Sequence, residues 1–319
     1  MKESASSSRQ APAAPSRATA LSPCRLLDYA QQRMQVVRTI EDCRAVRRQM
    51  QRLAFVPTMG ALHPGHASLI RAARDHAPDV AVSIFVNPTQ FGRNEDFGKY
   101  PRTFDADLEL CRDAGATLIF APDAQTMSPP DSPAVIVDLP NLTDVLEGKH
   151  RPGHFRGVCQ VVAKLFNIVQ PDVAMFGRKD FQQLRVLEAM VEALDFPIRI
   201  IGCPTIREHD GLAMSSRNRY LSSDERQRAL SISRALRLAG AEYDSGVRQA
   251  NRLVALMQNT LLDVGQLGHV PLSIEYAACV DPRTLRPLVQ ITGPALLAIA
   301  ARVGTTRLID NTLLGEPAA

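Results

Sequence analysis

Between about residue 36 and residue 204, short apolar runs alternate with segments of helical spacing. The run 80–86 is apolar almost throughout, which is typical of a strand buried on both faces. Residues 157–169 instead place apolar side chains at 158, 161, 162, 165, 166 and 169, a stripe with a 3.6-residue period. Repeated strand–helix alternation produces right-handed crossovers and a parallel sheet covered on both faces. The pattern therefore predicts an α/β fold with a Rossmann-like doubly wound parallel sheet.

The expected elements of this first part can be given by residue range. Strands are expected at 53–57, 80–86, 117–121, 134–139, 173–176 and 198–202. Helices are expected at 66–77, 104–115, 157–169 and 180–194, with Gly115 as a C-cap. Beyond residue 204, two helical segments (223–244 and 248–264) precede two strand candidates, 272–281 and 295–304, and the segment 306–310. This change of pattern predicts a second, smaller α+β domain, with domains at 34–204 and 205–319.

The first 33 residues differ from the rest of the 319-residue chain. Fifteen of the first 25 are Ser, Ala or Pro, and no apolar periodicity is present. We expect a disordered tail over 1–33. The same composition is found in transit peptides, an alternative that Glu3 and the prolines weaken.

Charge, cysteine spacing and hydropathy argue against a nucleic-acid-binding, metal-binding or membrane protein. The net charge of +4, from 37 basic and 33 acidic residues, is too small to indicate a nucleic-acid or membrane partner. The six cysteines are scattered without metal-binding or redox spacing, which is typical of reduced thiols in a cytoplasmic protein. No apolar run approaches the roughly 20 residues of a membrane span.

The polar motifs follow expected strands at their carboxyl ends, where doubly wound sheets bind ligands. Gly60 and Gly65 have the spacing of the glycines in a P-loop, but His66 and Ala67 stand where that loop has Lys and Ser or Thr. His63 and His66 share one face at the start of a helix, whose N-terminus offers free N–H groups and a partial positive charge to a phosphate. The alternative is that both histidines are only polar caps.

Three further segments carry groups suited to anionic or hydroxylated ligands. Asn87 and Gln90 are neutral hydrogen-bonding side chains, or else form an Asx turn. The segment 177–183 offers Lys179 to a phosphate, with Asp180 expected to cap the next helix and Gln183 facing the same crevice. The loop 214–217 ends in a permanent cation, although two serines before an arginine also suit a simple helix cap.

The basic segment 148–157 is open to two interpretations. It contains His150, Arg151 and His154, with three glycines and a proline. These residues either guide an anionic substrate or form a basic surface turn. The surface interpretation is favoured for His150 and Arg151, and the functional one for His154.

Taken together, these motifs resemble one family. His63 to His66 (HPGH) and Met214 to Arg217 (MSSR) resemble the HIGH and KMSKS pair of nucleotidylyltransferases and class I tRNA synthetases. Within that superfamily, PTMGALHPGH, SIFVNPTQF, YPRT, RPGHFRGV, KLFNIVQPD, GRKDFQQL, DGLAMSSRN and RLIDN resemble the pantothenate synthetase family, over about residues 36–314.

The resemblance implies an activity and a set of partners. The family condenses (R)-pantoate with β-alanine through pantoyl adenylate, with MgATP as substrate, no tightly bound organic cofactor and a homodimeric assembly. It implies His66, His63, Lys179 and Arg217 as the catalytic residues. Gln90, Gln183 and Asn87 would bind pantoate, and Gln90 would also lie beside β-alanine. The implied ATP contacts are Met59, Gly60, Ala61, Leu62, His63, Pro64, Gly65, His66, Gly177, Arg178, Lys179, Asp180, Ile206, Met214, Ser215, Ser216 and Arg217.

Two departures and two competing functions accompany this hypothesis. Arg178 stands where many relatives carry Glu, and the metal ligands are undefined, with Asp96 and Asp107 near the expected site. An adenylyltransferase acting on a phosphorylated acceptor would need cations where Asn87, Gln90 and Gln183 are neutral. A catalytically silent nucleotide-binding protein would not need the His, Lys, Ser and Arg set.

Overall fold

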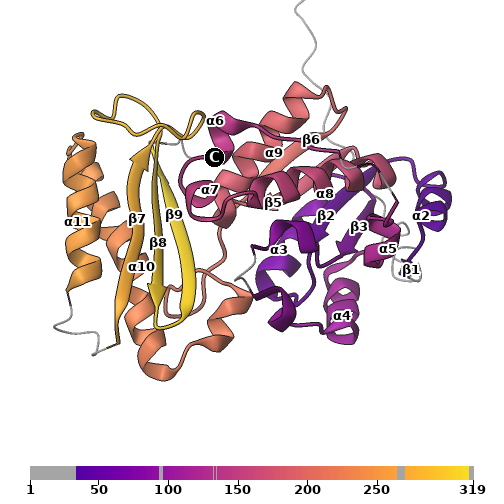
Figure 1. Cartoon of the computed structure of the whole chain (residues 1–319), viewed down its shortest axis with the longest axis horizontal. Helices are drawn as coiled ribbons and strands as arrows, with labels where there is room; N and C mark the ends of the chain where they lie inside the picture. The colour runs from indigo at the N-terminus through magenta and orange to yellow at the C-terminus, as the bar shows by residue number, and fades with distance from the viewer. Residues whose placement is uncertain (1–33, 93–95, 132, 134, 264–269, 316–319) are drawn as a thin grey trace, which may run out of the picture. The chain divides into compact units, whose positions relative to one another are not determined.

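The computed structural model describes residues 34–92, 96–131, 133, 135–263 and 270–315. From Met34 on, the chain forms one compact unit that contains two sheets (Figure 1). The expected tail over 1–33 lies outside the described residues, and the division into domains at residue 204 stays a prediction. Among the described residues, no helix combines the length and apolar character of a membrane span.

The larger sheet has six parallel strands in the order β1-β4-β3-β2-β5-β6. These are β1 (Gln35–Val37), β2 (Leu53–Thr58), β3 (Asp79–Ile84), β4 (Leu118–Phe120), β5 (Val173–Gly177) and β6 (Arg199–Cys203). The chain runs outward from β2 to β4 and then crosses to the other side of β2. The strand order therefore reverses between β2 and β5, which is where such sheets bind ligands.

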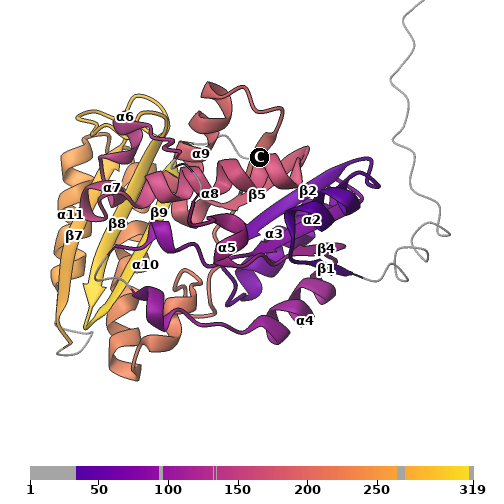
Figure 2. The same cartoon turned by 45° about the vertical axis from the view of Figure 1, so that its right-hand side comes forward.

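Helices cover both faces of this sheet. They are α2 (Ile40–Arg47), α3 (Pro64–Arg74), α4 (Phe104–Ala114), α5 (Ala124–Met127), α6 (Pro140–Thr143), α7 (Glu147–His150), α8 (His154–Val169) and α9 (Phe181–Ala193). Alternate residues of β2 enter different cores: Leu53 and Phe55 pack with α8 and α9, and Ala54 and Val56 pack with α3 and α4. Figure 2 shows α8 and α4 on opposite sides of the strands. The doubly wound α/β prediction is confirmed.

The smaller sheet is antiparallel, in the order β7-β8-β9. It consists of β7 (Leu272–Val280), β8 (Ala295–Val303) and β9 (Thr306–Leu314), preceded by α10 (Ser223–Asp244) and α11 (Ala250–Leu262). One face, with Leu297 and Ile299, packs on α10 and α11, and the other, with Leu296 and Ala298, joins the core of the parallel sheet. Both faces are buried, which explains the continuous apolar run of β8.

One expected strand is not formed, and one strand of the structure was not expected. Residues 135–139 form no strand: Val135 and Ile136 are 63% and 72% exposed, and no neighbouring strand supplies backbone partners. The apolar run alone could not show this, because pairing depends on a neighbour distant in sequence. The edge strand β1 was not anticipated, since its three residues are too few to give a periodic signal.

Five of the six cysteines are described, and all five are buried and free. Burial raises the pKa of Cys43 and Cys279 to about 11 and that of Cys111 and Cys159 to about 12. These thiols are therefore neutral core side chains, as expected, and Cys24 lies outside the described residues.

Candidate active site

A cavity of about 240 Å³ lies at the carboxyl ends of β2, β3, β5 and β6. The first turn after each of these strands contributes to its wall, and so does the loop before α10. Its apolar side is formed by α8. The residues from the expected set that line it are Met59, His63, Gly65, His66, Asn87, Gln90, Gly177, Lys179, Asp180, Gln183, Ile206, Met214, Ser215, Ser216 and Arg217.

His63 and His66 form a reciprocal capping box at the start of α3. The N–H of Gly65 donates to His63 Nδ1 at 3.2 Å, and the N–H of His63 donates to His66 Nδ1 at 3.3 Å. Because each Nδ1 accepts, each neutral ring carries its proton on Nε2. Both rings line the cavity, so each can offer one N–H donor to a ligand.

The pKa values of both histidines are lowered from the ordinary 6.5. Burial, followed by the charge of Lys179, lowers the pKa of His63 to about 4. Burial, followed by the influence of His63, lowers the pKa of His66 to about 3. At neutral pH the two rings are therefore hydrogen-bond donors without positive charge, and the cationic groups of the site are Lys179 and Arg217.

The expectation that this helix N-terminus presents free N–H groups is wrong for residues 60–66. Each of these N–H groups has a partner within the protein, and Pro64 has none to give. The acceptors are Thr58 Oγ1 for Gly60, the two Asp107 oxygens for Ala61 and Leu62, His66 Nδ1 for His63, His63 Nδ1 for Gly65 and His63 O for His66. Polar contacts from this turn must therefore come mainly from the imidazoles.

Asp107 fixes the turn that leads into α3. Its Oδ2 accepts from the N–H of Ala61 at 3.0 Å, and its Oδ1 accepts from Leu62 at 2.8 Å and from Thr103 Oγ1 at 3.0 Å. These bonds hold Ala61 at φ 50°, a left-handed conformation that costs a non-glycine residue of order 1–3 kcal/mol. The side chain, considered above as a metal ligand, is buried, and both of its oxygens accept hydrogen bonds from the protein.

Gly60 is required beside this carboxylate. It has φ +78°, and a Cβ at this position would lie 3.0 Å from Asp107 Oδ2. The glycine therefore allows the turn to approach Asp107, and its expected role in the approach of a ligand stays a prediction.

Asn87 acts on Gln90. Its Oδ1 accepts from the N–H and the hydroxyl of Thr89, and its Nδ2 donates to Gln90 Oε1 at 3.2 Å and to the carbonyl of Gly157 at 3.1 Å. The Asx-turn alternative is thus correct for its local conformation. Gln90 also donates to Met59 Sδ at 2.9 Å and keeps one amide hydrogen for a ligand.

The three charged residues of the turn after β5, at 178–180, have different surroundings. Lys179 lines the cavity with its Nζ 3.9 Å from Asp180 Oδ2. Burial acts to raise the pKa of Asp180, but the charges of Lys179 and Arg217 outweigh it and lower that pKa. The predicted cap is wrong, because Asp180 is the N-cap of α9 without a side-chain cap bond. Arg178 does not line this cavity, and its side chain lies beside Gly202 of β6.

The 214–217 loop is joined to the start of α3. The N–H of Gly65 lies 3.1 Å from Met214 Sδ, and the N–H of Met214 donates to the carbonyl of Ile206 at 2.9 Å. Ser215 caps the short turn Ser216–Tyr220 by accepting from the N–H of Arg217. The cap interpretation is therefore correct locally, while the same residues face the cavity.

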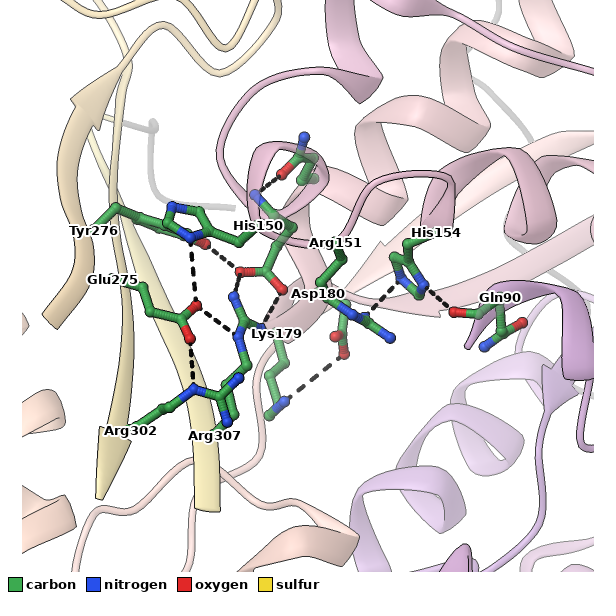
Figure 3. A network of polar contacts seen from close by, with 12 residues as sticks. Gln90, His150, Arg151, His154, Lys179, Asp180, Glu275, Tyr276, Arg302 and Arg307 are labelled. Carbon is green, nitrogen blue, oxygen red and sulfur yellow. Dashed lines mark hydrogen bonds and ion pairs between the residues drawn. The ribbon is translucent and has the colours of Figure 1, made fainter. Parts of the chain in front are cut away.

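His154 does not line the cavity, but its side chain is hydrogen-bonded to Gln90, which does (Figure 3). Arg151 can only donate, so His154 Nε2 accepts from it at 2.9 Å and His154 Nδ1 donates to the carbonyl of Gln90 at 2.8 Å. His150 instead has its Nδ1 3.8 Å from Glu275 Oε2, and its ring is tilted against that of Tyr276, away from Gln90. The structure thus places His154, and not His150, against Gln90, and the functional role expected for His154 stays a prediction.

Some residues implied as ATP contacts are placed differently from the rest. Gly60, Ala61, Leu62, Pro64 and Arg178 form the turns and do not line the cavity. The roles of Asp107 and the small sheet were missed. Only the order of motifs hinted at them, through YPRT before Asp107 and RLIDN in β9.

Fold and site together define an enzyme of the HIGH-motif nucleotidyl-transfer class. The family model for pantoate-beta-alanine ligase matches residues 34–313, and the chain belongs to that family. It is 51% identical to a pantothenate synthetase of Acidobacterium capsulatum, over 84% of this chain and 88% of the relative. It is 52% identical to pantothenate synthetase 1 of Bradyrhizobium diazoefficiens, over 84% and 93%.

Solved structures agree with this assignment. The pantothenate synthetase of Thermus thermophilus superposes with a TM-score of 0.82 and 42% identity, covering 88% of this chain and 99% of that one. The pantoate-beta-alanine ligase of Francisella tularensis, solved in complex with beta-gamma ATP and beta-alanine, has a TM-score of 0.71 and 32% identity, covering 88% and 98%.

Proposed function

We propose that this protein condenses (R)-pantoate with β-alanine to give pantothenate, with ATP converted to AMP and pyrophosphate. One observation carries the proposal: a chain of the pantoate-beta-alanine ligase family has a cavity at its β2–β5 switch point that is lined by His63, His66, Lys179 and Arg217. These are donors and cations suited to a triphosphate.

The reaction has two steps. A pantoate carboxylate oxygen attacks the α-phosphorus of ATP, the bond from that phosphorus to the α–β bridging oxygen breaks, and pyrophosphate leaves. The β-alanine amine then attacks the acyl carbon, AMP leaves with the acyl oxygen, and the amine loses a proton. Positioning and charge stabilisation dominate the first step, since no protein group becomes covalently attached.

The roles of the side chains follow from their chemistry. His66 and His63 offer Nε2–H donors to the phosphates, and Lys179 and Arg217 supply the positive charge that balances the departing pyrophosphate. Gln90 and Gln183 bind the pantoate hydroxyls and carboxylate, with Gln90 also beside β-alanine and held by Asn87. Val158 and Val162 of α8 form an apolar wall suited to the geminal methyl groups of pantoate.

Several residues contribute to nucleotide binding through the backbone or through their position. We assign Met59, Gly65, Gly177, Asp180, Ile206, Met214, Ser215 and Ser216 to direct contact with ATP, and Gly60 to Leu62 and Pro64 to the shape of the turn.

Magnesium enters with ATP as its substrate complex. The described residues contain no group of three or more His, Cys, Asp or Glu that could hold a metal, and both oxygens of Asp107 accept protein hydrogen bonds. This donor set does not fit a resident metal centre, and it is compatible with Mg²⁺ held through phosphates and water. We further propose a homodimer in the cytoplasm, as the resemblance implies, with light scattering of the purified protein as the test of assembly.

Isotope exchange tests the reaction. Labelled pyrophosphate should enter ATP in the presence of pantoate and the absence of β-alanine, because the adenylate forms before the amine acts. Exchange that requires β-alanine, or that proceeds without pantoate, would contradict the two-step reaction. Incorporation with a phosphorylated acceptor in place of pantoate would favour the adenylyltransferase alternative.

A further inference from the structure

Asn311 of β9 is hydrogen-bonded to the turn that carries Lys179. Its Nδ2 donates to the carbonyl of Arg178 at 3.0 Å and to the carbonyl of Lys179 at 2.7 Å. The side chain is 9% exposed. Both hydrogens of one amide nitrogen are thus used on two consecutive carbonyls of another element.

These carbonyls determine where Lys179 points. Residues Arg178–Asp180 form a single short turn between β5 and α9, and no side-chain cap fixes its end. Holding two successive peptide planes fixes the direction of the Cα–Cβ bond between them, which belongs to Lys179. The long, flexible lysine side chain is therefore directed into the cavity by its backbone.

The preceding residue, Asp310, holds the 214–217 loop, and it does so through an ion pair with Arg207. Its carboxylate accepts from Arg207 at 2.7 and 3.1 Å, and its side chain is 2% exposed. Arg207 forms an isolated antiparallel bridge with Ala213, the residue before Met214. The bidentate pair thus anchors the base of the 214–217 loop.

Strand β9 is itself fixed along its length. Arg307, on the same face as Asn311, donates to both oxygens of Glu147 at 2.6 and 2.7 Å and to Glu275 at 2.7 Å. Figure 3 shows this group between the small sheet and α7, close to Lys179. These ion pairs fix the position of β9, and with it the positions of Asp310 and Asn311.

We propose that Asn311 is a positioning residue for Lys179, and that Asp310 positions the 214–217 loop through Arg207. Two consecutive residues of β9 thus fix the positions of both segments assigned to ATP, the turn 178–180 and the loop 214–217. This inference rests on the proposed function, which assigns both loops to ATP.

The test measures nucleotide affinity separately from turnover. In Asn311→Leu, which keeps the branching of the side chain but removes its donors, the Kd of a fluorescent ATP analogue and the KM for ATP in pyrophosphate exchange should rise about tenfold. The KM for pantoate should change by less than about twofold. Leu313→Ala is the matched control, since Leu313 lies on the same face and packs against the core. It should lower the melting temperature and leave both ATP parameters unchanged.

A double-mutant cycle tests whether Asn311 acts through Lys179. In a Lys179→Ala background, Asn311→Leu should have no further effect on the Kd. Additive effects, or an Asn311→Leu protein that loses stability without losing ATP affinity, would overturn the proposal. If Asn311→Leu does not fold, Asn311→Ser, which is smaller and polar, is expected to shift the same parameters.

Asp310→Asn tests the 214–217 loop. The Kd of the fluorescent ATP analogue and the KM for ATP should rise in this variant as well. An unchanged Kd in this variant would remove Asp310 from the proposal. Failure of the proposed function gives a different pattern: the wild-type protein would show no pantoate-dependent exchange, while the Asn311 effect on analogue binding would persist.

Discussion

His63 and His66 hold each other in place at the start of α3. Their ring centroids lie 4.1 Å apart, and the N–H of His63 donates to His66 Nδ1 at 3.3 Å. Each ring can therefore cap the helix and bind a ligand at the same time. Its Nδ1 accepts a backbone hydrogen bond of the helix start, while its Nε2 carries the proton that can be donated to a ligand. The two interpretations of the histidine pair, cap or ligand, are compatible.

His66 should be needed for adenylation. Removing one preorganised donor of this kind costs roughly 10²–10³ in rate, so His66→Ala should lower pantoate-dependent pyrophosphate exchange by about that factor. His66→Gln should recover part of the loss, since its amide offers a donor. His76→Ala, beyond the other end of α3, is the control and should exchange normally. Near-normal exchange in His66→Ala would reduce the histidine to a cap.

Stability should fall as the pH is lowered below 6.5. Above that value the imidazoles are neutral in both the folded and the unfolded chain, so stability is fully present. Between pH 6.5 and the folded pKa values of about 4 for His63 and about 3 for His66, only the unfolded chain takes up protons. The loss of unfolding free energy between about pH 7 and about pH 5 should be smaller in His63→Gln/His66→Gln. Equal losses, measured by urea denaturation, would contradict the depressed pKa values.

Asp107→Asn should destabilise the turn before α3. An amide cannot accept from the N–H groups of both Ala61 and Leu62 without turning a donor toward one of them. One buried N–H left without an acceptor costs about 1–3 kcal/mol of unfolding free energy, measurable by urea denaturation. Pyrophosphate exchange should fall as well, since the turn leads directly to His63.

Asp105→Asn is the control for this variant. Asp105 lies in the same first turn of α4 but is exposed. Equal stability of the two variants would show that the hydrogen bonds of Asp107 contribute little.

Arg178→Glu should leave ATP binding nearly unchanged. The side chain lies beside Gly202 and not in the cavity, so its charge acts on Cys203 and Glu188 rather than on the phosphates. The KM for ATP should change by less than about twofold, whereas Lys179→Ala should abolish exchange. A large rise in KM for Arg178→Glu would place the guanidinium at the nucleotide after all.

Residues 1–30 should be dispensable. They lack apolar periodicity, and the family model begins at residue 34. A protein lacking them should keep its unfolding free energy within about 0.5 kcal/mol and its turnover, measured beside the full chain. A clear loss of either would show that the segment contacts the enzyme.

The helices were largely predictable from periodicity and caps. The expected helix at 223–244 coincides with α10, and Gly115 ends α4 with φ 94°. Buried parallel strands were equally clear, because strands covered on both faces are continuous apolar runs. The predicted strand at 134–139 was wrong because a strand also needs a neighbouring strand to pair with, and apolar composition does not provide one.

The residue types of the site were also determined by the sequence, since HPGH, NPTQF and GRKD follow strands that end at one edge, and MSSR lies beyond the last of these strands. Only the tertiary structure decided which atoms are available there. Asp107, 45 residues from Leu62, occupies backbone N–H groups that the local sequence leaves free, and Arg178 turns away while Lys179 turns inward. Likewise Asn311, 132 residues from Lys179, fixes its carbonyl. Local sequence encodes dihedral preference and burial pattern, whereas hydrogen-bond partners depend on which distant segments the packed core brings together.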